Sequence, residues 1–540
     1  MEAEEILRLY ENLEASKSPF NNLFQEVSDF ILPSKPDVIQ SNLPNRRKGA
    51  MLLDSTGVHA CQLLASSMHG ALTPTSLKWF GLKLRDDVIN DQPEVRNWLE
   101  DCARRLDNAL NSSNFSSEIH EVFLDLAGFG TAAVLQEELP KDEGGGFAGL
   151  HFETLPIGDY VFAEGRNGRV DTLLRRFTLS AGQAEARFAS HPGFQGFGDK
   201  LQAALREHGP EGRQKRFSFI HAIQPRPKSH SGPRRLAYRM PLASIMVEVD
   251  EKKVIYESGY REFPVAVVRW SQTSGDDGWG RSPGMTALPD VKTLNEADKL
   301  ALMALQKDLA PPLIAPNKGL IGGFSFSPNA INYYDNTKGK PEYLTSGVRW
   351  DVARLKSDER RERVRRIFYA DQLMLQQGPQ MTAAEVHVRF ELMQRLLGPT
   401  LGRLIAELLN PILHRGFQLM LRAGGFPNPP LALQGMLERK GPPTLDVEYV
   451  GPLARAQKAQ EVVAIERAYT LASSISRSRG GDPAIFDNLD DDKALRYGAE
   501  QAGLPGDILR GDSDRDSVRA QRMKQAQQMQ AALAQQAAKG

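Results

Sequence analysis

The sequence predicts an α+β fold that is mainly helical, and three regions of the chain support this prediction. Over most of the first 130 residues, apolar side chains recur every three or four positions, as in amphipathic helices. From there to about residue 270 they occur in short runs bounded by turn residues, which is typical of strands. The middle then reads as helix, Pro-rich insert and charged helix, followed by further helical segments.

Composition sets the bounds of this prediction. The chain has 540 residues, enough for several lobes rather than one core, with 41% apolar and 25% charged residues. No run of about 18 apolar residues occurs, so we expect no membrane contact. The acidic start, Met1-Glu2-Ala3-Glu4-Glu5, argues against a cleaved secretory signal. Two cysteines exclude a disulfide framework and indicate a reducing cytoplasm.

Four helices are expected first, and prolines mark the ends of two of them. Pro33 and Pro36 end the first helix, and Pro74 ends the second. The four helices are expected over Met1–Leu32, Asp54–Leu72, Pro93–Leu110 and Phe115–Ala127.

Strands follow these helices, and they complete an α+β lobe. Asn167-Gly168 predicts a tight turn between two of the strands, and two short helices are expected near Ala181 and Leu201. The strands are expected over Thr131–Glu138, Leu150–Thr154, Tyr160–Ala163, Val170–Leu179, a segment from Phe217, Ser244–Val249, Val254–Gly259 and Phe263–Trp270.

The middle of the chain predicts two helices separated by an insert. Thr286–Leu309 has apolar residues on one face, and a second helix starts near Asp351. The insert between them, Ala310–Trp350, is rich in proline and glycine and is too short to bury a core alone. We therefore expect the insert to pack against neighbouring copies of the chain.

Nine of the eleven residues from Lys356 to Arg366 are charged. Pairs spaced four apart, Glu359 with Arg363 and Glu362 with Arg366, predict ion pairs within the helix. Alternatively, some of these charges contact adjacent subunits or line a water-filled channel. The candidate residues for such contacts are Glu359, Arg360, Arg361, Glu362, Arg363, Arg365 and Arg366.

A polar, uncharged loop follows this helix. It comprises Gln376, Gln377, Gly378, Pro379, Gln380 and Met381. The T-x-x-E pattern from Thr382 predicts a helix that runs toward Arg422 and bends at Pro399 and Pro411.

The last part of the chain is predicted to be helical and polar. Helices are expected over Pro452–Ser474 and Asp492–Ala502. The Ala- and Gln-rich segment Ala520–Gly540 indicates either a frayed tail or a helix that becomes ordered only against other copies.

Two motifs resemble catalytic loops, but neither lies in the required context. Gly128–Ala133 matches the dinucleotide-binding pattern G-x-G-x-x-A, but it follows a helix and opens a strand, the reverse of the required order. Gly280–Gly284 matches the hydrolase pattern G-x-S-x-G, but Pro283 removes the N–H that would stabilise an oxyanion. Only His387 and His414 lie downstream as bases. We expect turns at both motifs.

We therefore predict no enzyme, no metal site and no cofactor. No P-loop pattern occurs either. A hydrolase on the N-terminal α+β lobe is the alternative, and a filamentous or scaffold protein is a third hypothesis.

The charges balance, with 67 basic and 67 acidic residues. Proteins that grip DNA through its phosphates usually carry a basic excess, so this balance favours a protein that does not bind nucleic acid. The alternative is a conduit, since a channel that lets DNA slide should not hold it tightly.

Short motifs in a fixed order resemble one known family. They are Phe30-Ile31-Leu32-Pro33, Asp54-Ser55-Thr56-Gly57, Leu72-Thr73-Pro74 with Trp79-Phe80, Pro264 to Trp270, Gly278 to Gly284, and Pro311-Pro312-Leu313. Together they resemble the head-to-tail connecting, or portal, proteins of short-tailed bacteriophages, over roughly Tyr10–Gly451.

The resemblance implies a ring, typically of twelve subunits, at one capsid vertex of the virion, assembled in the host bacterial cytoplasm. The implied partners are further copies of the chain, weakly bound double-stranded DNA without sequence preference, the terminase motor, capsid and scaffolding proteins, and tail or adaptor proteins. The channel would serve DNA packaging into the capsid and ejection from it.

The resemblance also implies a division into lobes. The wing is expected over residues 1–285 and 382–451, the stem helices over 286–309 and 351–375, the clip over 310–350, the tunnel loop over 376–381 and the crown over 452–540. The residues that would project into the channel are Gln376, Gln377, Gly378, Pro379 and Gln380.

Overall fold

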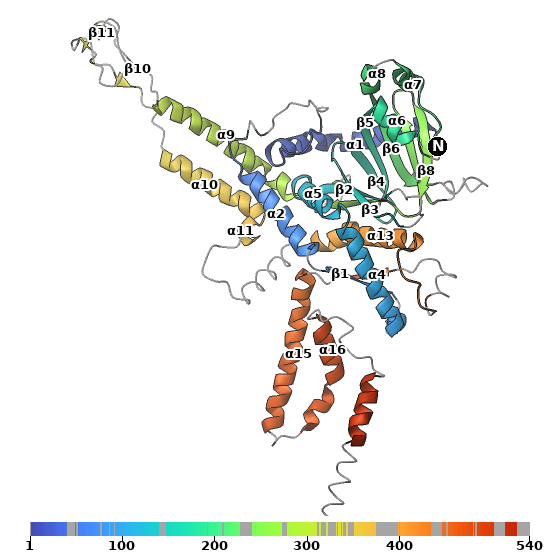
Figure 1. Ribbon diagram of the computed structural model, residues 1–540. Coiled ribbons are helices and arrows are strands. Elements are labelled where there is room, and N and C mark those ends of the chain that lie inside the picture. The colour runs from blue at the N-terminus through green and yellow to red at the C-terminus, as the bar shows by residue number, and fades with distance from the viewer. Residues whose placement is uncertain are drawn as a thin grey trace, which may run out of the picture.

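The computed structural model is an α+β protein, mostly helical, from whose central body two sets of helices project (Figure 1). It describes residues 2–39, 49, 52–75, 78–85, 87–90, 92–139, 147–191, 193–207, 210–226, 240–272, 278–309, 313–314, 320–321, 331, 333–335, 337, 342–343, 350–373, 398, 400–431, 433, 445–449, 452–478, 480, 483–501 and 514–525. In these residues, no helix combines the length and the hydropathy that crossing a bilayer requires.

A five-stranded antiparallel sheet forms one side of the body. Its strands follow chain order, and Gly168, at φ 67°, makes the predicted tight turn between the first two. The strands are β4 (Tyr160–Glu164), β5 (Val170–Ser180), β6 (Arg216–Pro225), β7 (Leu242–Glu248) and β8 (Lys253–Tyr260).

Helices cover both faces of this sheet. The start of α1 (Ala3–Phe30) packs on one face through Ile6 and Tyr10. On the other face, α6 (Ala181–Phe188) and α7 (Asp199–Arg206) share an apolar cluster with Phe219 of β6, and the short α8 (Pro210–Gln214) packs against these two helices. The alternating side chains of the strands therefore serve two separate apolar clusters.

The larger core lies beside a three-stranded sheet in the order β3-β2-β9. These strands are β2 (Thr131–Glu138), β3 (Leu150–Leu155) and β9 (Val265–Arg269). The helices around them are α2 (Thr56–Leu72), α4 (Pro93–Asn111), α5 (Phe115–Phe129) and α13 (Asn410–Arg422).

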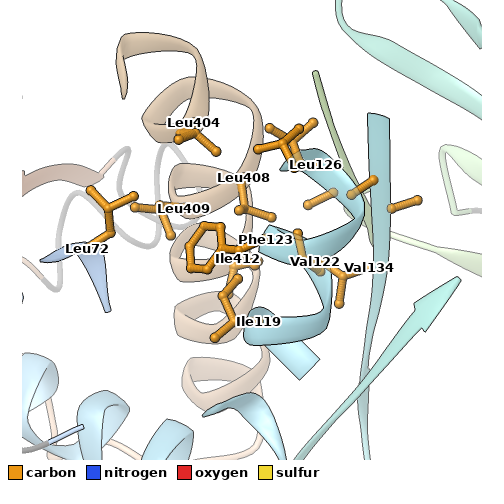
Figure 2. Close-up of a cluster of buried hydrophobic side chains, with 14 of the residues drawn as sticks. Leu72, Ile119, Val122, Phe123, Leu126, Val134, Leu404, Leu408, Leu409 and Ile412 are labelled. Atoms are coloured by element: carbon orange, nitrogen blue, oxygen red, sulfur yellow. The ribbon is translucent and has the colours of Figure 1, made fainter. Parts of the chain in front are cut away.

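Figure 2 shows where three parts of the chain meet in this core. Ile119, Val122, Phe123 and Leu126 of α5 face Leu404, Leu408, Leu409 and Ile412 of the late helical segment, with Leu72 of α2 beside them. Apolar residues spaced three or four apart on α5 form this stripe, as the sequence predicts.

The pairing of two strands at the edge of the body was not predicted. β1 (Phe80–Leu84) pairs antiparallel with β14 (Leu445–Tyr449), with Phe80 opposite Tyr449. The short helix α3 (Asp87–Asn90) follows β1. The two strands lie far apart in the sequence, so neither could be recognised by a partner nearby in the chain.

Two helices project together from the body (Figure 1). α9 (Pro283–Leu309) leads outward and α10 (Trp350–Ile367) returns, followed by α11 (Ala370–Leu373). At their far end, β10 (Leu313–Ile314) pairs with β13 (Glu342–Tyr343), and β11 (Leu320–Ile321) pairs with β12 (Tyr333–Tyr334). The predicted start of the outgoing helix at Thr286 is three residues late, because the helix begins at Pro283.

The predicted helix from Thr382 to Arg422 is described only in part. Residues 382–397 and Pro399 lie outside the described residues, whereas a π-helical turn, η5 (Ile405–Leu409), precedes α13. Pro411 lies in the first turn of α13 and has no N–H, and the N–H of Asn410 bonds to the Ile405 carbonyl five residues back. The irregularity predicted at Pro411 is therefore a widened turn.

A second group of helices projects elsewhere from the body (Figure 1). It comprises α15 (Pro452–Ser478), the 3-10 helix η6 (Pro483–Asn488), α16 (Asp491–Gln501) and a helix over residues 514–525. α15 and α16 confirm the two predicted helices. Residues 526–540 lie outside the described residues, so the two interpretations of the Ala- and Gln-rich tail stay open.

Candidate functional site

The candidate functional site is the projecting pair α9 and α10, together with the joint that fixes it to the body. Both glycine-rich motifs singled out in the sequence meet at this joint. Gly130 has φ 78° and ends α5, and its carbonyl accepts the Trp270 N–H at 2.9 Å. The Gly280 N–H donates to the Thr131 hydroxyl at 2.8 Å. The two motifs are therefore turns that pack against each other.

Ser282 is a helix cap rather than a nucleophile. Its hydroxyl donates to the Gly128 carbonyl at 2.6 Å and accepts the Met285 N–H at 2.9 Å. The side chain is buried, and both hydrogen bonds serve the start of α9. Of the two downstream histidines, His387 lies outside the described residues, and His414 lies on α13 in a separate groove.

Close backbone contact at the joint requires glycine. A Cβ atom on Gly284 would lie 2.6 Å from the carbonyl oxygen of Gly128, and one on Gly57 would lie 2.9 Å from a methyl group of Val291. The first contact joins α9 to α5, and the second joins α9 to α2. At Gly284 two backbones approach more closely than a side chain allows, and at Gly57 the backbone makes room for the Val291 side chain; both contacts fix the direction of α9.

An ion-pair node holds α10 beside α9 and α2. Arg361 donates to Asp54 at 2.8 Å, to Asp298 at 2.9 Å and to Asp358 at 3.1 Å. Asp54 precedes α2 and also accepts the Thr56 N–H at 2.8 Å. We call Arg361, Asp54 and Asp298 the stem-base node.

The node keeps a buried carboxylate charged. Burial by itself would raise the pKa of Asp54, but hydrogen bonds from Arg361 and Thr56 outweigh it and hold the pKa below its usual value. The hydrogen bond to Asp54 in turn raises the pKa of Arg361, against the effect of burial. Both groups are therefore charged at neutral pH.

The rest of the charge run on α10 is more exposed. Arg360 contacts Asp290 at 3.2 Å, and Glu359 lies 4.0 Å from Arg363. Glu362 pairs with Arg365 at 3.4 Å, whereas no pair with Arg366 is found in the described part of the chain. Arg361 is thus held by carboxylates of its own chain, whereas Glu359, Arg363, Arg365 and Arg366 lie largely at the surface. Arg363 also lies 3.8 Å from Asp290.

The outer half of α9 is apolar on several faces. Its large side chains are 45–77% exposed, although α10 runs beside it. These residues are Leu300, Leu302, Met303, Leu305 and Leu309. We call them the outer α9 surface.

The predicted loop residues cannot be placed beside these elements. Gln376, Gln377, Gly378, Pro379 and Gln380 lie outside the described residues. Their expected position between the charged helix and the late helix rests on the sequence alone.

Sequence reasoning missed a second buried ion-pair network, which joins β9 to η5. Arg269 is 1% exposed and donates to Glu407 through its backbone N–H at 3.0 Å and through its guanidinium at 2.8 and 3.2 Å. It also pairs with Glu164 of β4. An arginine at the end of an otherwise apolar strand was the signal in the sequence.

Four residues that the resemblance singles out pack around the joint. Leu32 lies against Gly128, and Trp279 packs against Phe20, Phe24, Tyr160 and Phe162. Asp54 and Arg269 belong to the two networks above. The motifs therefore specify how the projecting pair is attached.

Comparisons with known proteins identify relatives over nearly the full length. A family model described as bacteriophage head to tail connecting protein matches residues 3–509. The portal protein of Salmonella phage epsilon15 is 29% identical over 100% of this chain and 94% of its own length. The probable portal protein of Bordetella phage BPP-1 is 30% identical over 98% of this chain and 92% of its own length.

A chain from the virion of a native gene transfer agent particle is a more distant structural match. It is 13% identical, with a TM-score of 0.30, over 72% of this chain and 91% of that chain. At this score the match carries no argument.

Proposed function

The chain belongs to the bacteriophage head-to-tail connecting protein family, and from this membership we propose that its copies close into a portal ring. The ring would form the channel through which double-stranded DNA enters and leaves the capsid. This is a structural role in the virion, and the two motifs that suggested catalysis are accounted for by the joint at the base of α9.

The outer α9 surface is the observation that carries the proposal. A helix that is apolar on several faces is normally buried, but α10 covers only one side of α9. Burying a large apolar side chain stabilises a protein by about 1.5–3 kcal/mol, so five such residues favour association strongly. Neighbouring copies in a ring would supply the missing cover along the outer half of α9.

The subdivision into lobes follows the same premise. The body, residues 1–285 and 382–451, would be the wing. The pair α9 and α10, within 286–309 and 351–375, would be the stem. The two short strand pairs within 310–350 would belong to the clip. Residues 376–381 would be the tunnel loop and 452–540 the crown.

The charge run would supply the polar part of the contact between copies. Because Arg361 is held in the stem-base node, we assign the intersubunit role to the exposed Glu359, Arg363, Arg365 and Arg366. Exposed ion pairs contribute little each and are screened by salt, so they would set register rather than stability.

The partners are proposed from the same family role. The ring would receive a separate terminase motor, which is consistent with the lack of a P-loop pattern in this sequence. Its outer surface would contact capsid and scaffolding proteins, and its clip would meet tail or adaptor proteins.

Ring formation can be tested by electron microscopy and sedimentation of the purified chain. We expect wild-type rings, and loss of rings in the double variant Leu302→Glu, Leu305→Glu. Leu431→Glu is the matched control, because Leu431 is exposed but lies outside α9. Charge reversal at Arg363 and Arg366 should weaken the rings at moderate salt. A folded monomer from the wild type, or normal rings from the double variant, would contradict the proposal.

A further inference from the structure

The free edge of β9 borders a groove that is closed at one end by the pair of Arg269 and Glu407. β9 ends its three-stranded sheet, and no strand in the described residues pairs with its other edge. The groove has a volume of about 580 Å³. Val265 and Val267 of β9, Pro411 and His414 of α13, and Arg85 and Arg169 at the rim are among its lining.

The hydrogen-bond register shows which backbone groups of β9 face this groove. The Trp270 N–H bonds to the Gly130 carbonyl, and the Gln136 N–H bonds to the Pro264 carbonyl. In an antiparallel pair every second residue bonds to its partner strand, so Ala266 and Val268 face β2. Val265, Val267 and Arg269 therefore direct their backbone groups away from β2.

Only one of these three outward positions has a partner. Glu407 of η5 accepts the backbone N–H of Arg269 at 3.0 Å and so closes one end of the edge. For the N–H groups of Val265 and Val267 no partner is found among the described residues, although both residues are at most 5% exposed. Unpaired backbone groups at such burial are rare in folded proteins.

The rim of the groove is positively charged. Glu262 is engaged by Arg422, and Glu407 by Arg269, whereas Arg85 and Arg169 have no ion pair in the described part of the chain. Asp446 also lines the groove and likewise has no ion pair among the described residues, so positive charge exceeds negative charge there. Burial, and then the charges of Arg85 and Arg169, lower the pKa of His414, although Asp446 acts in the opposite direction. Two cations and one carboxylate without an ion pair thus lie beside the free strand edge.

We propose that this groove binds an extended, acidic peptide segment of a partner protein, which adds a strand to the β9 edge. Backbone groups of the peptide would pair with Val265 and Val267, as in β-strand addition to other sheets. A carboxylate of the peptide would pair with Arg85 or Arg169. Glu407 sets the register, because the strand cannot extend past it.

The test uses a fluorescent peptide, Thr-Val-Asp-Val-Asp-Thr, and its counterpart with lysine in place of aspartate. Anisotropy is measured with the full chain in the assembly state in which it purifies. We expect the acidic peptide to bind and the basic one to bind at least about ten-fold more weakly. Absence of binding by the acidic peptide, or equal binding of both, would overturn the proposal.

Two variants separate the site from general charge attraction. Arg169→Glu should weaken binding about ten-fold. Arg166→Glu should leave it unchanged, because Arg166 is exposed in the same turn between β4 and β5 but does not line the groove. Equal losses in both variants would indicate attraction to the surface alone and would overturn the site.

Strand addition itself is measured by hydrogen exchange in the wild-type protein. This measurement uses no variant, so a folding defect cannot affect it. The amides of Val265 and Val267 should exchange more slowly when the acidic peptide is present. Val267→Pro should abolish binding, because it deletes an outward N–H while Ala266 and Val268 keep theirs. Unchanged exchange at both valines would contradict the proposal even if the peptide bound. Ring formation is not read in any of these measurements, so their failure would leave the portal proposal standing.

Discussion

Arg361 is the residue on which the attachment of α10 depends. It joins α10 to Asp54 before α2 and to Asp298 on α9, and Asp54 is only 5% exposed. Removing the arginine would leave a buried carboxylate without its cation. Such a loss costs more than the pair itself contributes, because the desolvated charge remains.

We therefore expect Arg361→Gln to lower the free energy of unfolding by about 2 kcal/mol, reduced from a fully buried pair because Arg361 is partly exposed. Arg365→Gln is the control, since Arg365 pairs with Glu362 at the surface and should cost about 0–0.5 kcal/mol. Urea unfolding measures both. Equal effects would show that the node is no stronger than a surface pair.

Lys17 is a second residue whose environment has a measurable consequence. Its ammonium group is fully buried and donates to the carbonyls of Ile157 at 2.6 Å and Tyr160 at 3.1 Å. It also lies 5.5 Å from the ring centre of Trp279. Burial lowers its pKa to about 8, although Glu14 and Asp159 act in the opposite direction.

The sign of the pH dependence follows from this shift. Between about pH 8 and the ordinary value of 10.5, the unfolded chain binds a proton that the folded chain has lost. Stability contributed by this group therefore rises with pH across that window, by up to about 3 kcal/mol. The difference in unfolding free energy between wild type and Lys17→Met should grow accordingly. Urea unfolding at several pH values checks this, and a constant difference would contradict it.

At the scale of elements, η5 shows why a widened turn persists in the late helix. The turn presents Glu407 to both the backbone and the guanidinium of Arg269, and so ties this helix to β9. Pro411 is the local cause of the widened turn, and the ion pair between Glu407 and Arg269 is the long-range cause.

Glu407→Gln should therefore lower the free energy of unfolding by about 3 kcal/mol, because Arg269 is almost wholly buried. Glu296→Gln is the matched control, since Glu296 pairs with Lys299 on the exposed side of α9 and should cost about 0–0.5 kcal/mol. Thermal and urea unfolding report both. A loss at Glu407 no larger than at Glu296 would show that Glu164 alone neutralises Arg269.

Elements that depend on local periodicity could be predicted from the sequence. The helices of the first 130 residues, the meander from β4 to β8 and α9 have amphipathic or alternating patterns, whereas α10 was expected from its charge run. The pairing of β1 with β14 could not be predicted, because strand partners distant in the chain leave no local pattern. The early start of α9 was missed for the same reason, since Ser282 is held by Gly128.

The candidate site was predictable only in outline. The charge run on α10 is obvious in the sequence, but its innermost member could not be identified. Arg361 differs from Arg360 and Arg365 in bonding to Asp54 and Asp298, and Asp54 lies 307 positions earlier in the chain. The aspartate before Thr56 was recognised as part of a motif, whereas its role as a partner required the fold.

At the scale of the whole molecule, the proposed ring must satisfy two opposite demands. Its copies must hold together firmly, and apolar association through the outer α9 surface can supply this without charge. Its lining must also let a dense polyanion pass. A chain with 67 basic and 67 acidic residues has no overall attraction for DNA that would trap it.

We propose that the loop over residues 376–381 projects into the channel, so it must let DNA pass without holding it. Its glutamines offer short, exchangeable hydrogen bonds, whereas lysine in their place would form ion pairs with successive phosphates. Each such contact strengthens DNA binding and makes it depend on salt. We therefore expect a variant with Lys at Gln376, Gln377 and Gln380 to form normal rings but to stall DNA packaging.

Packaging measured in vitro with the terminase motor checks this, with Asn at the same three positions as the uncharged control. Because each copy in the ring would contribute its own loop, lysines from two or more copies would lie together in one narrow part of the channel. The loss of packaging should therefore be large. Raising the salt concentration should relieve the stall, because it weakens phosphate contacts. Normal packaging by the lysine variant at low salt would place these residues away from the DNA.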